Sequence, residues 1–121
     1  TKPSTIVMKY MQKYGFKVIP INPRAKGEKI LGEKVFEKIT DIKEPVDIID
    51  VFRPSKEVFL IAKDAVKIGA KVLWLQLGIR DKDSKELVEK NNIEYIENKC
   101  TKMEYQKHFL KIRQAFPVLS N

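Results

Sequence analysis

Hydrophobic and polar positions follow two patterns that alternate along this chain. Apolar residues at helical spacing predict helices over 4–14, 55–69, 83–91 and 101 to about 115. Short runs in which nearly every position is apolar predict strands over 16–21, 46–52, 71–75 and 93–96. Residues 24–33 are polar and are predicted to form a loop, and 35–42 form a short helical or irregular stretch.

The alternation of helix and strand predicts an α/β fold with an open, doubly wound parallel sheet. Strands that are apolar on both faces are typical of parallel sheets covered by helices. We expect one domain over residues 1–111 and a poorly patterned tail over 112–121. The pattern begins on a helix, whereas the first strand of such a sheet is central. We therefore expect a further strand and loop upstream of this sequence.

Two serines stand where helices are predicted to begin. Ser4 and Ser55 are expected to be N-caps, because a serine hydroxyl accepts a hydrogen bond from the free N–H groups of a first turn. Gly15 and Gly69 stand where a left-handed residue ends a helix.

Each predicted strand is followed by a loop that contains a cation. Ligands of open parallel sheets bind at the carboxyl ends of the strands. A cation in each loop therefore indicates an anionic ligand, although about a fifth of all residues are Lys or Arg. The four loops are Asn22-Pro23-Arg24, Arg53-Pro54-Ser55, Gln76 to Arg80, and Asn98 to Thr101.

The charge balance also favours anionic partners. Among 121 residues there are 24 Lys and Arg against 16 Asp and Glu, a net charge of +8. Nucleic acid, a phosphorylated ligand and an acidic protein are the classes that such an excess attracts, although many basic domains bind none of them. No apolar run approaches the ~20 residues of a membrane span, and no signal peptide is recognised. The single cysteine, Cys100, excludes an intrachain disulfide and favours a reducing cytoplasm.

Residues suited to catalysis are few. His108 lies in the charged last helix and is expected to be a surface residue. Cys100 follows the last strand, where it is either an inert core thiol or a redox-active one whose pKa the charge of Lys99 lowers. No zinc-ligand spacing, phosphate-binding Walker loop or dinucleotide fingerprint is present.

Three further residues lie in predicted strands. Asp47 and Asp50 are an odd number of positions apart and so point to opposite faces, which excludes a paired acid and base. Asp50 is expected to be a polar anchor near the strand end. Trp74 is expected in the core, with base stacking as the alternative.

Several segments, in this order, resemble the family of small CoA-binding domain proteins. The resemblance runs from residue 2 to about 105, and Asn98-Lys99-Cys100 has Lys where the family has Arg. The other segments that carry it are Lys2-Pro3-Ser4, Gly15 to Pro23, Ile30 to Val35, Val46 to Ser55 and Gly69 to Gly78.

The resemblance implies a Rossmann-type domain, similar to the CoA-binding domain of succinyl-CoA synthetase, with CoA or acyl-CoA as its ligand. The family's first strand and its Gly-containing phosphate loop have no counterpart in this sequence. Carried over by position, the binding residues are Lys2, Ser4, Asn22, Pro23, Phe52, Arg53, Pro54, Ser55, Gln76, Leu77 and Gly78.

The first interpretation is a non-catalytic module that binds or senses CoA. The alternative is an enzyme that acts on an acyl-CoA or a nucleotide, in the manner of a ligase, but the one histidine lies in no Gly-rich loop. Nucleic-acid binding is the weakest interpretation, because the cations are spread along the chain. Assembly into a homo-oligomer is left open.

Overall fold

A three-stranded parallel sheet forms the centre of the computed structural model, which describes residues 2–110. Its strands are β3 (Ile48–Val51), β4 (Val72–Leu75) and β5 (Glu94–Ile96), in the spatial order β3-β4-β5. Both pairings are parallel. Three of the four predicted strands are thereby confirmed, although each is somewhat shorter than its apolar run. The predicted α/β fold is confirmed as well.

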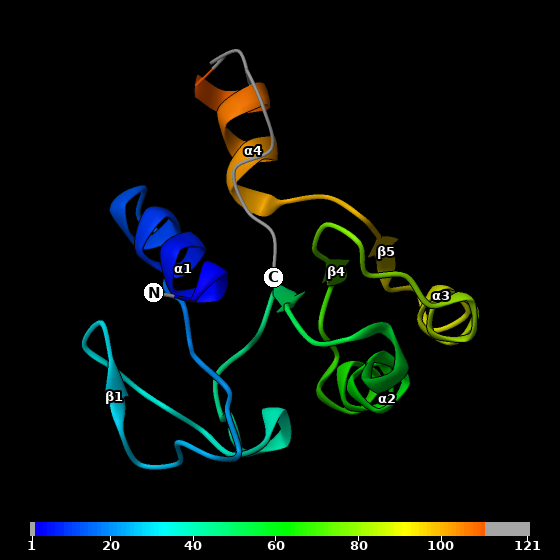
Figure 1. The fold of residues 1–121 in the computed structure, drawn as a ribbon. Helices are drawn as coiled ribbons and strands as arrows, with labels where there is room; N and C mark the ends of the chain where they lie inside the picture. The colour runs from blue at the N-terminus through cyan, green and yellow to red at the C-terminus, as the bar shows by residue number, and fades with distance from the viewer. Residues whose placement is uncertain (1, 111–121) are drawn as a thin grey trace.

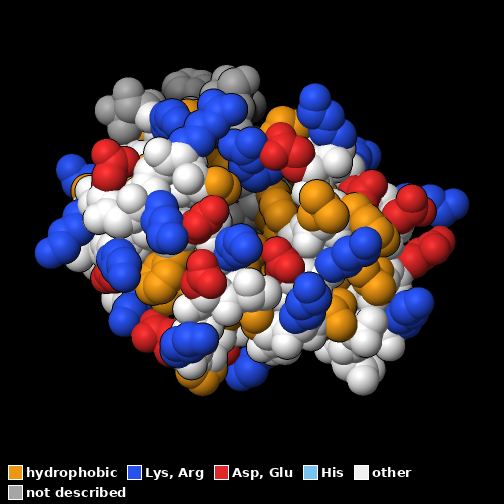
Figure 2. Space-filling view, turned by 90° about the horizontal axis from the view of Figure 1, so that it is seen from below, with side chains coloured by type: hydrophobic (Ala, Val, Ile, Leu, Met, Phe, Trp, Pro, Cys, Tyr) orange, Lys and Arg blue, Asp and Glu red, His pale blue; other side chains and the backbone are white. Residues whose placement is uncertain are grey.

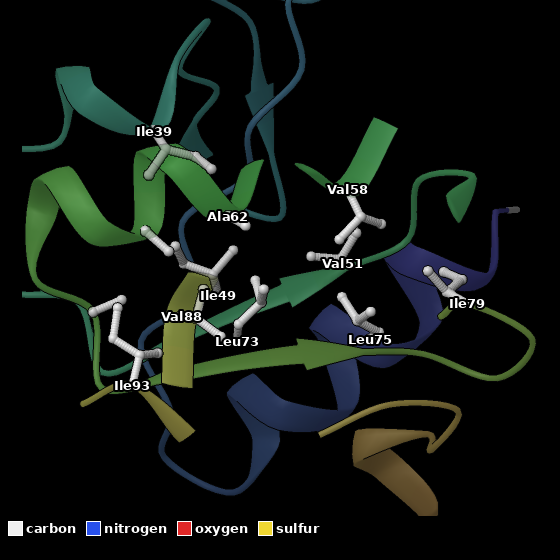
Figure 3. Packing of buried hydrophobic residues seen from close by; sticks show 12 residues of the cluster. Ile39, Ile49, Val51, Val58, Ala62, Leu73, Leu75, Ile79, Val88 and Ile93 are labelled. Carbon is white, nitrogen blue, oxygen red and sulfur yellow. The ribbon is translucent and has the colours of Figure 1, made fainter. Parts of the chain in front are cut away.

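The main hydrophobic core lies between this sheet and two helices, α2 (Val58–Ile68) and α3 (Lys82–Glu89). Alternate residues of a strand point to the same face, and the register places Ile49 beside Leu73. Figure 3 shows the side chains of both strands directed toward these helices. The buried residues of this cluster include Ile49, Val51, Val58, Ala62, Ala65, Leu73, Leu75 and Val88.

The opposite face of the sheet is covered by α1 (Pro3–Lys13) and α4 (Thr101–Tyr105), which continues as the π-helix η3 (Gln106–Leu110). Figure 1 shows α1 and α4 on one side of the strands and α2 and α3 on the other. Aromatic rings join the two helices, with the rings of Tyr14 and Tyr105 5.1 Å apart. Helices on both faces make this a doubly wound sheet, as predicted. Within residues 2–110, no helix has both the length and the apolarity to cross a bilayer.

The strand predicted over 16–21 does not form. This segment is extended, but its only strand-like pairing among the described residues is a single bridge between Ile21 and Phe36. Strand propensity reflects how well a side chain packs on a half-buried sheet. Ile21 is exposed here, so its preference for a strand is not supported by packing. The predicted loop instead contains a short antiparallel hairpin of β1 (Lys29–Ile30) and β2 (Glu33–Lys34).

Strand β3 is at the edge of the sheet. The carbonyl groups of Asp47 and Val51 accept from the chain at β4, so the alternate residues Ile48 and Asp50 direct their main-chain groups to the outer edge. Figure 1 shows β3 between β4 and the hairpin segment. No pairing of that outer edge occurs within residues 2–110. A further strand upstream stays a prediction.

Both predicted serine caps are wrong. Helix α1 begins at Pro3 after Lys2, and no side chain caps it. Proline suits a first helical position, because its missing N–H would have no partner there. Ser55 opens a 3-10 turn, η2 (Ser55–Glu57), before α2, and its hydroxyl accepts from Arg80 instead.

The third predicted helix begins one residue earlier than expected. Asp81 caps it by accepting from the N–H of Ser84 at 3.1 Å. The last helix begins at Thr101 as predicted, but its continuation beyond residue 110 and the predicted tail over 112–121 lie outside the described residues.

Candidate functional site

The loops that follow β3, β4 and β5 meet at one edge of the sheet. The main-chain N–H of Arg80, after β4, donates to Ser55 Oγ, after β3, at 3.0 Å. The main-chain N–H of Gly78, also after β4, donates to Asn98 Oδ1, after β5, at 2.7 Å. These two hydrogen bonds join three loops into one surface at the carboxyl ends of the strands.

The junction between the second and third loops requires unusual backbone angles. Gly78 has φ +81° and Asn98 has φ +56°, both in the left-handed region. Glycine enters this region without strain, and asparagine is enriched there among the other residues. A Cβ at Gly78 would meet nothing within 4 Å, so the φ angle is what requires glycine in this structure.

A network of buried polar groups lies beneath these loops. The side-chain amide of Gln76 donates to the carboxylate of Asp50 and, at 3.0 Å, to Thr101 Oγ1. The Thr101 hydroxyl donates to Asp50 Oδ2 at 2.8 Å. Burial raises the pKa of the Asp50 carboxyl to about 6, although both hydrogen bonds favour the ionised form. The prediction that Asp50 is a polar anchor is thereby confirmed.

The side chain of Gln76 is buried and bonded within the protein, so it holds the loops together and does not face the surface. Only 4% of the residue is exposed, and its amide nitrogen is bonded to the two groups named above. Asp47, by contrast, is exposed and forms an ion pair with Lys71 at 3.2 Å. The two aspartates therefore have different environments, as their spacing predicted.

The exposed part of the surface carries cations and apolar groups. The Arg53 guanidinium donates twice to Glu57 Oε1, at 2.8 and 3.2 Å. Arg80 lies 3.9 Å from a carboxylate oxygen of Glu97, at the limit of an ion pair. The residues beside these cations that are also exposed are Pro54, Leu77, Gly78 and Lys99.

Cys100 is buried, with 2% of its surface exposed, and it directly precedes α4. Burial raises the pKa of its thiol above the usual value, and the opposing main-chain N–H groups and the Lys102 charge do not outweigh that effect. The expectation that Lys99 lowers this pKa is therefore wrong. Of the two roles left open by the sequence, burial favours an inert thiol.

Trp74 is half-buried on the face of the sheet opposite the main core. Its indole N–H donates to the main-chain carbonyl of Lys99 at 2.7 Å, next to Cys100. The ring therefore packs partly inside the protein, and its one donor is engaged within the fold.

Phe52 directly follows β3 and is half-buried, and the remaining residues carried over by resemblance lie outside the three joined loops. Lys2 is exposed and Ser4 half-buried at the start of α1, which Figure 3 shows at the end of the molecule toward which β3 and β4 run. Asn22 and Pro23 belong to the segment beside the hairpin, where Asn22 Oδ1 accepts from the N–H of Arg24. Figure 1 shows that segment beyond β3, on the side away from β4.

No role was predicted for the side chains of Asn98 and Thr101, although both belong to a predicted loop. Asparagine after a strand is a weak signal of a left-handed residue, and that signal is present here. The acceptor role of Asn98 and the donor role of Thr101 depend on contacts 20 and 51 residues away along the chain. No local pattern reports such contacts.

Proteins with known structures share this fold. The structure of ID.343 from Thermus thermophilus has 32% sequence identity and a TM-score of 0.86, and the match covers 89% of this chain and 81% of that one. A hypothetical protein from Pyrococcus horikoshii has 28% identity and a TM-score of 0.83, covering 88% of this chain and 73% of that one.

A curated protein from Bacillus subtilis, the uncharacterized protein YneT, is 29% identical over 102 residues, which are 84% of this chain and 74% of YneT. The family model described as the CoA binding domain matches residues 1–106. A match over that much of a 121-residue chain shows that this protein belongs to the CoA binding domain family.

Proposed function

We propose that this protein binds CoA or acyl-CoA at the carboxyl ends of β3, β4 and β5 and does not catalyse a reaction on it. The observation that carries the proposal is the joining of three loops at the edge where open parallel sheets bind ligands. Family membership supports the choice of CoA over other anions.

The residues of this edge suit the chemistry of CoA. Its pyrophosphate and ribose phosphate are anions, for which Arg53, Arg80 and Lys99 supply charge and donors. The pair of Arg53 with Glu57 is exposed, and exposed ion pairs contribute about 0–1 kcal/mol. Arg53 can therefore leave Glu57 and bind a phosphate with little loss of free energy. Pro54 offers a flat apolar surface to adenine.

The charge distribution supports a small anion over nucleic acid as the partner. On the face shown in Figure 2, Lys and Arg side chains are scattered among Asp and Glu side chains. A nucleic-acid site is expected to show a continuous basic stripe, and that face shows none.

The absence of catalysis is proposed from the state of the two most reactive side chains. Cys100 is buried with a raised thiol pKa, and His108 is exposed on η3, 3.3 Å from Glu104. Within residues 2–110, no hydrogen bond or ion pair joins these two residues. The competing hypothesis is an enzyme that acts on acyl-CoA, and measurable thioester hydrolysis or ligation by the purified protein would establish it.

Replacing Arg53 by alanine should weaken CoA binding. A phosphate contact from a guanidinium contributes roughly 1–3 kcal/mol, which is on the order of a tenfold to hundredfold rise in Kd. Isothermal titration of the wild type and of Arg53→Ala with CoA measures the change. Lys67→Ala is the matched control, because it removes one exposed positive charge at the far end of α2. Equal Kd values for the wild type and Arg53→Ala would exclude this role for Arg53.

Oxidised CoA should leave Cys100 unmodified in the native protein. A buried thiol with a raised pKa supplies little thiolate, and thiolate is the species that attacks a disulfide. Intact mass spectrometry should detect an adduct only after unfolding in denaturant. An adduct that forms on the native wild type and is absent from Cys100→Ser would instead support a redox-sensing role.

A further inference from the structure

We propose that Asp50 is a positioning residue of the ligand site, and that its protonation state sets the affinity of the three loops for their ligand. This inference rests on the proposed function, since the loops it concerns are those assigned to CoA. Asp50 lies in β3, Gln76 directly after β4, and Thr101 at the start of α4. One carboxyl group therefore connects three elements that the sequence separates by 25 to 51 residues.

The network is continuous with the surface above it. Gln76 is followed by Leu77 and Gly78, and the Gly78 N–H is bonded to Asn98. Asn98 in turn lies three residues before Thr101, which donates to Asp50. The loop after β4 is thus held to the chain after β5 twice, once at the surface and once beneath it.

Protonation changes the direction of a hydrogen bond in this network. The ionised Asp50 accepts from both Gln76 and Thr101, and such charge-assisted bonds are roughly twice as strong as neutral ones. A protonated Asp50 must donate its own proton, and Thr101 Oγ1 is the neighbour able to accept it. The Thr101 hydroxyl then turns its proton away from Asp50, and the bond between β3 and α4 becomes a neutral one.

Among the groups around Asp50 named here, the Asp50 carboxyl is the one expected to gain or lose a proton near pH 6. The Cys100 thiol, just before α4, interacts electrostatically with Asp50 and with Lys102, and it stays protonated because burial raises its pKa. Directly after β4, the group bonded to Asp50 is the uncharged amide of Gln76. Arg53, after β3, is bonded to Glu57. Burial brings the pKa of Asp50 itself to about 6, within the range of an ordinary titration.

The protein contains its own reporter of this change. Trp74 is the only tryptophan of the chain, and its indole N–H is bonded to the carbonyl of Lys99, two residues before Thr101. Wild-type tryptophan fluorescence should therefore show a transition with a midpoint near pH 6. Asp50→Asn should lack it, because an asparagine can accept from Gln76 and donate to Thr101 at every pH.

Two further variants make this titration specific. His108→Gln should retain the transition, which separates Asp50 from the one histidine of the chain. Thr101→Val should move the midpoint to higher pH, because the carboxylate loses one of its two donors. A wild type without a transition between pH 4.5 and 7.5, or an Asp50→Asn variant that keeps it, would overturn the proposal.

The pH dependence of the Kd for ligand is the second measurement of the test. Dephospho-CoA is the probe, because it lacks the 3′-phosphate, whose own second pKa is about 6. Wild-type Kd should be about fivefold higher at pH 5 than at pH 7.5, a coupling in the range usual between linked sites. In Asp50→Asn the two values should agree.

The outcomes separate this inference from the proposed function. Binding with the same pH profile in the wild type and Asp50→Asn would overturn the role of Asp50 and leave CoA binding intact. A folded wild type that binds neither CoA nor dephospho-CoA at any pH would overturn both.

Discussion

Replacing Leu73 by alanine should lower the free energy of unfolding by about 3–5 kcal/mol. Leu73 is fully buried in β4, the central strand of the sheet, and packs in the cluster formed with α2 and α3. The variant loses the transfer free energy of the three removed carbons and leaves a cavity that the surrounding core cannot fill completely. Urea unfolding followed by circular dichroism measures the difference.

Leu60→Ala is the matched control for this prediction. Leu60 is on α2, is 68% exposed, and loses the same atoms on substitution. Surface substitutions of this kind usually change stability by less than about 0.5 kcal/mol. A similar loss at both positions would mean that burial against the sheet is not what stabilises the fold.

The position of Leu73 also shows why much of the fold was predictable. The runs over 46–52 and 71–75 are apolar at nearly every position, as is typical of strands covered on both faces. The helix between them has one apolar stripe and must pack on one of those faces. Local patterns thus determined the order of elements and placed three loops at one edge.

The segment over 16–21 is also mostly apolar and yet forms no strand. A strand requires a partner, and the one pairing available to this segment within the described residues is the bridge from Ile21 to Phe36. The predicted helix cap at Ser55 was wrong for a related reason. The hydroxyl of Ser55 meets the main chain of Arg80, 25 residues away, and that contact exists only in the folded chain.

The candidate site was likewise predictable only in part. Its loops, which include Arg53 and Gly78, were predicted from the general position of ligands in parallel sheets. The structure instead revealed which groups hold the loops together. The bonds of Asn98 to Gly78 and of Thr101 to Asp50 join distant parts of the sequence, so they require the sheet register and cannot be found from spacing.

The free energy of unfolding should decrease by about 2.5 kcal/mol as pH rises from 4 to 7.5, through the Asp50 carboxyl alone. Burial raises its pKa from 3.8 to about 6 in the folded state. Between these two values the folded protein binds more protons than the unfolded chain, so raising the pH favours unfolding. The contribution is fully present below the unfolded pKa and is lost as pH rises through the folded one.

Other carboxylates titrate over the same range, so the measurement is a comparison of variants. Urea unfolding at pH 4, 5, 6 and 7.5 should show the difference between the wild type and Asp50→Asn changing by about 2.5 kcal/mol across the series. Asp47→Asn is the matched control, since Asp47 directly precedes β3 and its ion pair with Lys71 is exposed. That variant should run nearly parallel to the wild type, because an exposed pair contributes about 0–1 kcal/mol. If Asp50→Asn and Asp47→Asn follow the same pH profile, the Asp50 carboxyl is solvated in the folded protein and its pKa lies near that of the unfolded chain.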